Sequence, residues 1–311
     1  MTQIGNSDLD IFPLVFGGNV FGWTADKETS FDLLDEFTDA GGDMIDTADG
    51  YSWWVPGNEG GESETIIGAW LAARRSRDRV LLASKVGTKP GLKGLRPDTI
   101  NTAIDATLQR LGTDYVDLYY AHYDDPDVPM ADIVGTLSAL VDAGKVRYVA
   151  PSNFSAARVE EWCAVTTASG FHAAVALEPQ YNLVERDFET NGLRAAAQAH
   201  DLGVMPYYAL ASGFLTGKYR LGREVPGARA ERAMTYLTPR GEKVLAALDQ
   251  IAGEHRVAVA TVSLAWLRSQ PTVVAPIASA SRVEQLPSLL ASATLELTAE
   301  ELTLLSTVSA A

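Results

Sequence analysis

Eight short apolar segments, each followed by an amphipathic stretch, dominate this chain of 311 residues. Most lack polar alternation, as expected of parallel strands that are buried on both faces. The stretches between them repeat apolar residues at helical spacing, as in Phe31, Leu34 and Phe37, and Pro97 followed by Asp98 is typical of a helix start. The predicted strands are Leu14–Phe16, Asp43–Asp46, Val80–Lys85, Tyr115–His122, Val146–Ser152, Ala174–Gln180, Gly203–Tyr207 and Val273–Ile277.

Eightfold alternation of strand and helix predicts a parallel (β/α)8 barrel, an α/β TIM barrel, formed by residues 1–311 as one domain. The opening segment, with Asn6-Ser7-Asp8 as its turn, predicts an N-terminal β-hairpin that caps the barrel bottom. A doubly wound dinucleotide fold would place G-x-G-x-x-G after the first strand. That strand instead ends in Gly17-Gly18-Asn19-Val20-Phe21-Gly22, where we expect the glycines to let a ligand approach the backbone.

Four polar residues follow or end the predicted strands two, three and four. Asp46 and Tyr51 lie in Ile45–Tyr51, Lys85 ends one apolar run, and His122 ends the next. Barrel enzymes carry their chemistry at these strand ends. A phenol is a weak acid at neutral pH, so we expect the Lys85 ammonium, paired with Asp46, to lower the pKa of Tyr51. Tyr51 would then donate a proton to a substrate oxygen that His122 orients.

Charge and composition exclude several classes of partner. The formal net charge of −15 argues against nucleic acid and anionic membrane surfaces. No apolar run approaches the ~20 residues that span a bilayer, and no signal peptide is visible. The single cysteine, Cys163, fits a reducing, cytoplasmic setting. His172, His200 and His255 lack metal-ligand spacing, so no metal is expected.

The order of these motifs resembles the aldo-keto reductase family, from Ile4–Leu9 to Ser281–Leu286. The resemblance implies that Tyr51 is the acid, Lys85 and Asp46 its tuning partners and His122 the orienting group. It also implies a nicotinamide cofactor, NADPH in preference to NADH, and a small-molecule carbonyl substrate. The implied cofactor-binding residues are Gly18, Asn19, Asp46, Ser152, Asn153, Gln180, Tyr207, Leu210, Gly213, Lys218, Arg229, Ser281, Arg282 and Gln285.

Within that set the resemblance implies distinct contacts. Ser152, Asn153 and Gln180 would meet the carboxamide, and Tyr207 would stack on the nicotinamide. Lys218 and Arg229 would hold the pyrophosphate. Ser281, Arg282 and Gln285 would meet the adenosine 2′-phosphate, for which arginine forks are suited.

Two departures from the family pattern concern the loops. Tyr208-Ala209 stands where the family has Ser-Pro, and Ser288-Leu289 replaces a Glu-Asn pair that often contacts adenine. We therefore expect a different loop shape after the seventh strand and a looser adenine site. Trp23, Trp53 and Trp54, on loops beside the quartet, are expected to form an apolar substrate wall.

The sequence thus predicts an enzyme that reduces aldehydes, with ketones as a further class. Two rivals are left open. One is a cofactor-binding sensor similar to the channel-associated beta subunits, with slow turnover. The other is a Schiff-base aldolase that uses Lys85.

Overall fold

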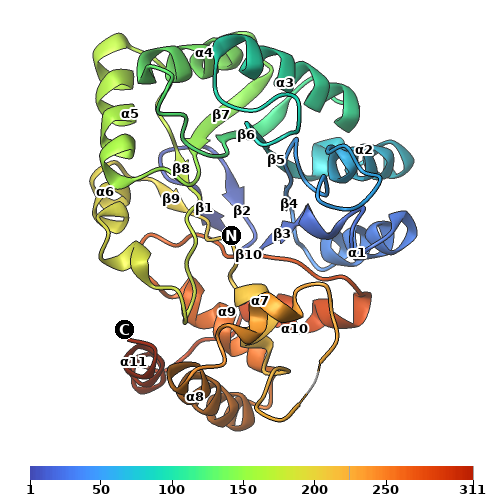
Figure 1. Ribbon diagram of the computed structural model, residues 1–311, viewed down its shortest axis with the longest axis vertical. Coiled ribbons are helices and arrows are strands. Elements are labelled where there is room, and N and C mark those ends of the chain that lie inside the picture. The colour runs from blue at the N-terminus through green and yellow to red at the C-terminus, as the bar shows by residue number, and fades with distance from the viewer. Residues whose placement is uncertain (224, 311) are drawn as a thin grey trace.

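The computed structural model describes residues 1–223 and 225–310 and has ten strands in this part of the chain. Parallel strands form a ring at the centre, with helices outside it (Figure 1). The strands are β1 (Thr2–Gln3), β2 (Asp10–Ile11), β3 (Val15–Gly17), β4 (Met44–Asp46), β5 (Leu81–Val86), β6 (Val116–Ala121), β7 (Val146–Pro151), β8 (Ala176–Leu177), β9 (Gly203–Val204) and β10 (Ile277–Ala278).

The helices follow the strands in sequence, as expected of repeated strand–helix units. Asp26 caps α1 by accepting a hydrogen bond from the Thr29 amide, and Pro97 begins α3 as predicted. The helices are α1 (Lys27–Asp39), α2 (Glu62–Arg74), α3 (Pro97–Leu111), α4 (Met130–Asp142), α5 (Ala156–Ser169), α6 (Leu193–Ala199), α7 (Ala230–Met234), α8 (Pro239–His255), α9 (Val259–Arg268), α10 (Leu286–Leu290) and α11 (Ala299–Val308).

The ring of strands is continuous through parallel pairing. One sheet runs in the order β10-β3-β4-β5-β6-β7, and β8 pairs with β9. Parallel bridges join Val149 to Ala174 and Val204 to Val273, and these link the two sheets on both sides. This parallel pairing is consistent with the predicted (β/α)8 barrel.

The last three predicted strands are shorter than the sequence suggested. β8 and β9 have two residues each, and the predicted strand Val273–Ile277 is wrong in its bounds, because β10 is Ile277–Ala278. Pro179, Pro206 and Pro276 lie in these segments and lack the amide hydrogen that a ladder needs. Isolated bridges such as Gln180 to Tyr207 continue the pairing there.

The N-terminal hairpin closes one end of the barrel. Its strands β1 and β2 pair antiparallel, with Thr2 opposite Ile11. Ile4, Leu9 and Ile11 are buried and belong to the apolar cluster that fills the barrel interior. Gly5 is required at the turn, because its φ is +46° and a Cβ atom would lie 2.2 Å from the Val175 carbonyl oxygen. A second, larger apolar cluster packs the strands against the helices.

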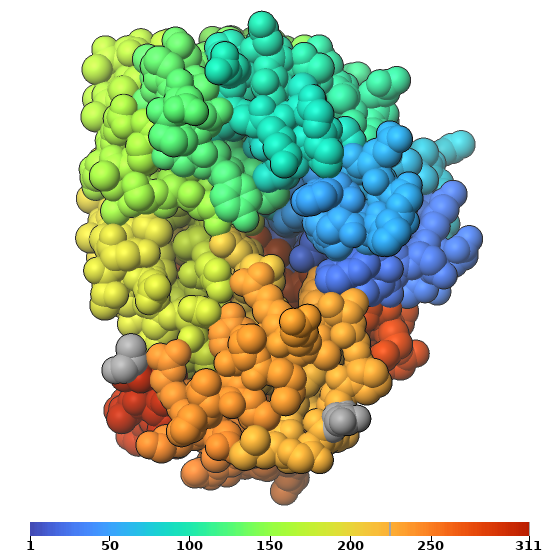
Figure 2. Space-filling model, in the orientation of Figure 1, coloured from blue at the N-terminus to red at the C-terminus, as the bar shows by residue number. Residues whose placement is uncertain are grey.

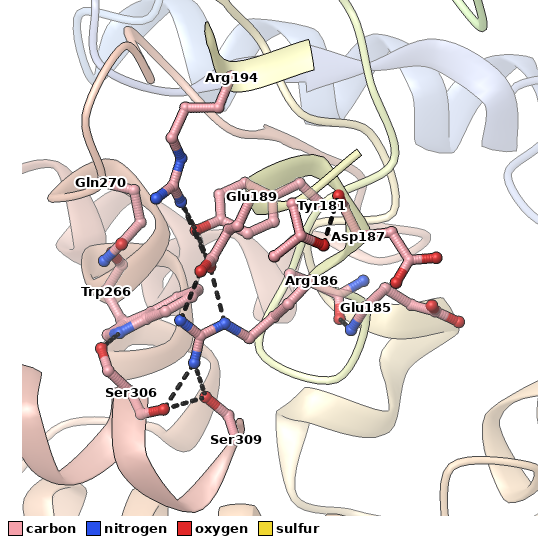
Figure 3. A network of polar contacts seen from close by, with 12 residues as sticks. Tyr181, Glu185, Arg186, Asp187, Glu189, Arg194, Trp266, Gln270, Ser306 and Ser309 are labelled. Atoms are coloured by element: carbon pink, nitrogen blue, oxygen red, sulfur yellow. Dashed lines mark hydrogen bonds and ion pairs between the residues drawn. The ribbon is translucent and has the colours of Figure 1, made fainter. Parts of the chain in front are cut away.

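A polar network fastens the segment after β8 to the C-terminal helix α11 (Figure 3). Arg186 donates to Glu189 at 2.7 Å, to the Ser306 carbonyl at 2.6 Å and to Ser309 Oγ at 2.8 Å. Its guanidinium carbon lies 5.4 Å from the Trp266 ring centroid. This network holds the outer end of the loop that begins at the mouth of the barrel.

We expect Arg186→Met to lower the free energy of unfolding by about 2–3 kcal/mol, because Glu189 and the end of α11 lose their shared partner. Urea denaturation of the purified protein measures the change. Arg220→Met is the matched control: its ion pair with Asp249 is far more exposed, so a loss below about 1 kcal/mol is expected. Equal losses in the two variants would contradict the anchoring role of Arg186.

Candidate active site

Three predicted residues meet at the end of the barrel opposite the hairpin. Asp46 ends β4, Lys85 lies near the end of β5, and Tyr51 comes from the turn after β4. Lys85 Nζ donates to Asp46 Oδ1, to the Thr47 carbonyl at 3.0 Å and to Tyr51 Oη at 2.8 Å. Tyr51 in turn donates to Asp46 Oδ2 at 3.1 Å. A fully buried ammonium thus supports the tyrosine hydroxyl from behind.

His122, which follows β6, lies beside Tyr51 with 5.9 Å between ring centroids. Its Nδ1 is 3.2 Å from Thr88 Oγ1. Burial, with a further contribution from the Lys85 charge, holds the pKa of His122 well below its usual value. The imidazole is therefore neutral at physiological pH and can act as a hydrogen-bonding group.

Glu178, directly after β8, is a second carboxylate at Lys85 that the sequence analysis missed. Its Oε1 lies 3.5 Å from Lys85 Nζ, and its side chain is 2% exposed. Its Oε2 is buried and has no hydrogen-bond partner among the described residues. Burial, together with the Asp46 charge, raises the pKa of Glu178 to about 8.

The expected lowering of the Tyr51 pKa is wrong. Burial raises the pKa of the Tyr51 phenol well above its usual value, and the carboxylates of Asp46 and Glu178 add to that effect. Two nearby carboxylates and the loss of solvent outweigh one ammonium that already pairs with Asp46. Tyr51 therefore keeps its proton throughout the neutral range.

A cavity of about 650 Å³ extends from this cluster across the mouth of the barrel. In Figure 2 the molecular surface is hollowed near its centre, where segments from the two halves of the chain meet. Most predicted site residues line the cavity: Asn19, Asp46, Tyr51, Trp53, Trp54, His122, Asn153, Tyr207, Leu210, Gly213, Lys218, Arg229, Ser281, Arg282 and Gln285.

One end of the cavity carries a group of cations. Lys218, Arg229 and Arg282 all line it, and within residues 1–223 and 225–310 none of them pairs with a carboxylate. Burial, then the charges of Arg282 and Arg229, lower the pKa of Lys218. Arg229 lies 4.9 Å from the Trp23 ring centroid and donates to Asn19 Oδ1 at 3.2 Å. Such a concentration of positive charge is suited to a phosphate-bearing ligand.

Five predicted residues lie outside the cavity wall. Lys85 reaches it through Tyr51, and Ser152 accepts a hydrogen bond from Asn153. Gln180 lines a neighbouring cavity of about 290 Å³. The two remaining residues pack against the protein itself, Gly18 against the Asp46 carbonyl and Trp23 edge-on against Trp54.

Aromatic side chains form a rim around the Tyr51 end of the cavity. Trp53, Trp54 and Tyr123 are exposed large side chains, and Tyr123 stacks on His122 with 5.2 Å between centroids. The sequence analysis had not selected Tyr123, although it directly follows the predicted strand end at His122.

Tyr208 gives the loop after β9 its own geometry. Its φ is +52°, and its ring lies 4.1 Å from the Arg232 guanidinium, which also donates to its hydroxyl at 2.8 Å. The Arg232 guanidinium thus helps to hold this loop, where the sequence departs from the family pattern, in place.

The three histidines outside the site each have a carboxylate partner. His172 and His200, which follow α5 and α6, and His255, at the end of α8, each approach a carboxylate at 2.7–2.9 Å. In the described part of the chain no three His, Cys, Asp or Glu residues cluster as metal ligands, and no helix is long and apolar enough to cross a membrane.

The raised pKa of Glu178 predicts how stability changes with pH. The pKa of Glu178 is about 8 in the folded protein, whereas the ordinary pKa of a glutamate is 4.5, so the native state holds an extra proton between these values. Stability is therefore lost as pH rises through this window. The new side chain of Glu178→Gln stays neutral, so only wild type should lose this stability. Relative to wild type, the free energy of unfolding of the variant should therefore be higher at about pH 8.5 than at about pH 5.5, as measured by urea titration. The same difference at both pH values would refute the shift.

Comparison with known proteins identifies the family of this chain. The aldo/keto reductase family profile matches residues 13–310. Protein tas of Escherichia coli (strain K12) is 31% identical over 96% of this chain and 94% of its own length. The oxidoreductase YrpG of Bacillus subtilis (strain 168) is 33% identical over 92% and 88%, respectively. An aryl-alcohol dehydrogenase of Pestalotiopsis microspora, GME11368, is 28% identical over 95% and 78%. The chain therefore belongs to the aldo/keto reductase family and is an NAD(P)H-dependent oxidoreductase.

Proposed function

We propose that this protein reduces aldehydes, and ketones as a further class, to alcohols with NADPH, and that Tyr51 is the proton donor. One observation carries the proposal. A protonated Tyr51 hydroxyl, 2.8 Å from the buried Lys85 ammonium, lines the same cavity as three cations that no described carboxylate neutralises. A proton donor at one end and a phosphate site at the other match a nicotinamide-dependent carbonyl reductase.

The residues present fit a nicotinamide dinucleotide. Lys218 and Arg229 would hold the pyrophosphate, with Arg282 at the 2′-phosphate. Near Tyr51, the buried Glu178 Oε2 has no described partner, and the carboxamide group of the nicotinamide would supply one. The cavity volume of about 650 Å³ is also in the range of cofactor sites. When bound there, the nicotinamide supplies the hydride.

The side chains of the site then deliver one proton to the substrate oxygen. A carbonyl carbon that accepts a hydride leaves an alkoxide, which is far more basic than a phenolate. Tyr51 can protonate it although burial raises the Tyr51 pKa. The Lys85 ammonium, 2.8 Å away, stabilises the phenolate that forms, and Asp46 holds Lys85 in place. Neutral His122 orients the carbonyl by a hydrogen bond.

Aromatic aldehydes are the substrate class that the rim favours. Trp53, Trp54 and Tyr123 present ring faces and edges to a ligand that enters beside Tyr51. The similarity to an aryl-alcohol dehydrogenase supports the same class. Trp23, which packs edge-on against Trp54 at 5.5 Å, supports this wall from behind.

We place the enzyme in the cytoplasm as a single barrel domain spanning the chain. The lone Cys163 has no partner thiol, and burial raises its pKa to about 11, so it is an unreactive thiol in helix α5. A reducing compartment suits such a protein.

Tyr51→Phe should abolish most turnover and leave cofactor affinity close to wild type, because only the proton donor is lost. The expected loss in kcat is roughly 10²–10⁴-fold on a panel of aromatic and aliphatic aldehydes. NADPH oxidation measures turnover, and fluorescence titration measures binding. If wild type binds NADPH but shows no saturating turnover on any carbonyl compound, the result favours a cofactor-binding sensor similar to the channel-associated beta subunits. If borohydride instead traps a carbonyl compound on Lys85, the result favours a Schiff-base aldolase.

Arg282→Ala should weaken NADPH about tenfold to hundredfold and leave NADH nearly unchanged, because Arg282 is the cation assigned to the 2′-phosphate. Ser281 and Gln285 are neutral and already bond each other, since Gln285 Oε1 accepts from the Ser281 amide at 2.9 Å. Dissociation constants for both cofactors are compared with those of Arg220→Ala, whose cation pairs with Asp249. A uniform effect on both cofactors would remove Arg282 from the 2′-phosphate site.

A further inference from the structure

Behind His122 lies a chain of hydrogen bonds that the proposed mechanism does not yet use. Thr88 Oγ1 is 3.2 Å from His122 Nδ1 and 3.3 Å from Asp49 Oδ1. Asp49 Oδ2 accepts from the Gly87 amide at 3.2 Å. Thr88 Oγ1 also lies close to the Gly50 backbone, since a Cβ atom added to Gly50 would be 2.5 Å from it, and this approach requires glycine. The hydroxyl therefore connects the carboxyl group to the imidazole.

A threonine hydroxyl has a single proton, so the chain can run in two directions. If Thr88 donates to Asp49, its oxygen accepts from His122 Nδ1–H, and Nε2 is a bare acceptor. If Asp49 carries a proton and donates to Thr88, then Thr88 donates to Nδ1, and Nε2 carries the hydrogen. Only the second arrangement gives the cavity an N–H donor for a carbonyl oxygen.

The surroundings of Asp49 favour its neutral form. Its side chain is 0% exposed, and its only described hydrogen bonds are the two long contacts to Gly87 and Thr88. The groups that face it are Glu64 on α2, Arg110 on α3 and Tyr119 on β6. Arg110 is already bound to Glu64 at 2.6 Å. No cation therefore contacts Asp49 directly among the described residues.

We propose that Asp49 and Thr88 are positioning residues that decide which nitrogen of His122 carries the proton. Neutral Asp49 sends a hydrogen bond through Thr88 to Nδ1 and leaves Nε2–H to bind the substrate oxygen. Ionised Asp49 reverses both bonds and removes that donor. The inference rests on the proposed carbonyl reduction, in which His122 orients the substrate.

The switch has a defined pH range. Burial, and then the Glu64 charge, raises the pKa of Asp49 to about 7. The donor form of His122 is thus present below about pH 7 and is lost above it. His122 stays neutral across this range, because burial and Lys85 keep its own pKa well below the usual value.

Nitrogen-15 NMR of the ring nitrogens, on the full chain without substrate or cofactor, tests the tautomer directly. His122 is assigned by the loss of its signals in His122→Gln. In wild type we expect Nε2–H below pH 7 and Nδ1–H above it. Asp49→Asn should hold Nε2–H throughout, because its amide donates to Thr88 at every pH. Thr88→Val should remove the pH response, and Thr88→Ser should retain it.

Steady-state reduction supplies the second readout. Wild-type kcat/KM should fall by up to about tenfold per pH unit above 7, and Asp49→Asn should lack this fall. One tautomer in wild type from pH 5.5 to 9, or a transition that persists in Asp49→Asn, overturns the proposal. If wild type reduces no carbonyl while the tautomer change is seen, the proposed function fails and the Asp49–Thr88 control of His122 stands.

Discussion

The buried ammonium of Lys85 is the interaction on which the site depends. It has no solvent exposure and is held by Asp46, the Thr47 carbonyl and Glu178. A buried charge that loses its partner costs several kcal/mol, so the partners of Lys85 must all stay in position around it. They join the ends of β4, β5 and β8, which come from distant parts of the chain. The position of the Tyr51 hydroxyl, bonded to both Lys85 and Asp46, follows from that junction.

The barrel supplies the convergence that such a junction needs. Parallel strands end at one rim, so a polar residue that ends an apolar run is directed to the same place as those of its neighbours. The hairpin fills the opposite end with Ile4, Leu9 and Ile11. With that end closed, the chemistry is confined to the open rim, where loops of unequal length form the cavity and its aromatic edge.

Sequence reasoning predicted the fold and the core of the site where the local pattern was strong. The four strands ending near Asp46, Lys85, His122 and Ser152 match the structure to within about one residue at most boundaries, because unbroken apolar runs define them. The later strands were less predictable, since Pro179, Pro206 and Pro276 interrupt their ladders.

What the sequence could not reveal is how charges from separate segments add. Glu178 reads locally as a strand end before a proline, and Asp49 reads as a turn residue. Only the fold shows that Glu178 shares the ammonium with Asp46, and that burial of Tyr51, with the charges of Asp46 and Glu178 added to it, raises the Tyr51 pKa instead of lowering it. Cation–π contacts such as Arg229 on Trp23 are equally invisible in a linear sequence.

The two ends of the cavity also explain how a chain with net charge −15 can hold an anionic ligand. Exposed charges are screened over about 8 Å at physiological ionic strength, so the overall acidity matters less than the nearest groups. At one end those groups are Lys218, Arg229 and Arg282.

At the other end of the cavity, Asp46 balances Lys85, while burial raises the pKa of Glu178 to about 8 and keeps it largely neutral near pH 7. With Glu178 neutral, negative charge that develops beside Tyr51 meets the balanced ion pair of Lys85 and Asp46. With both carboxylates ionised, this developing charge would be repelled by a second carboxylate that no cation neutralises. Two carboxyl groups in different protonation states, on one lysine, therefore keep this end of the cavity compatible with carbonyl reduction.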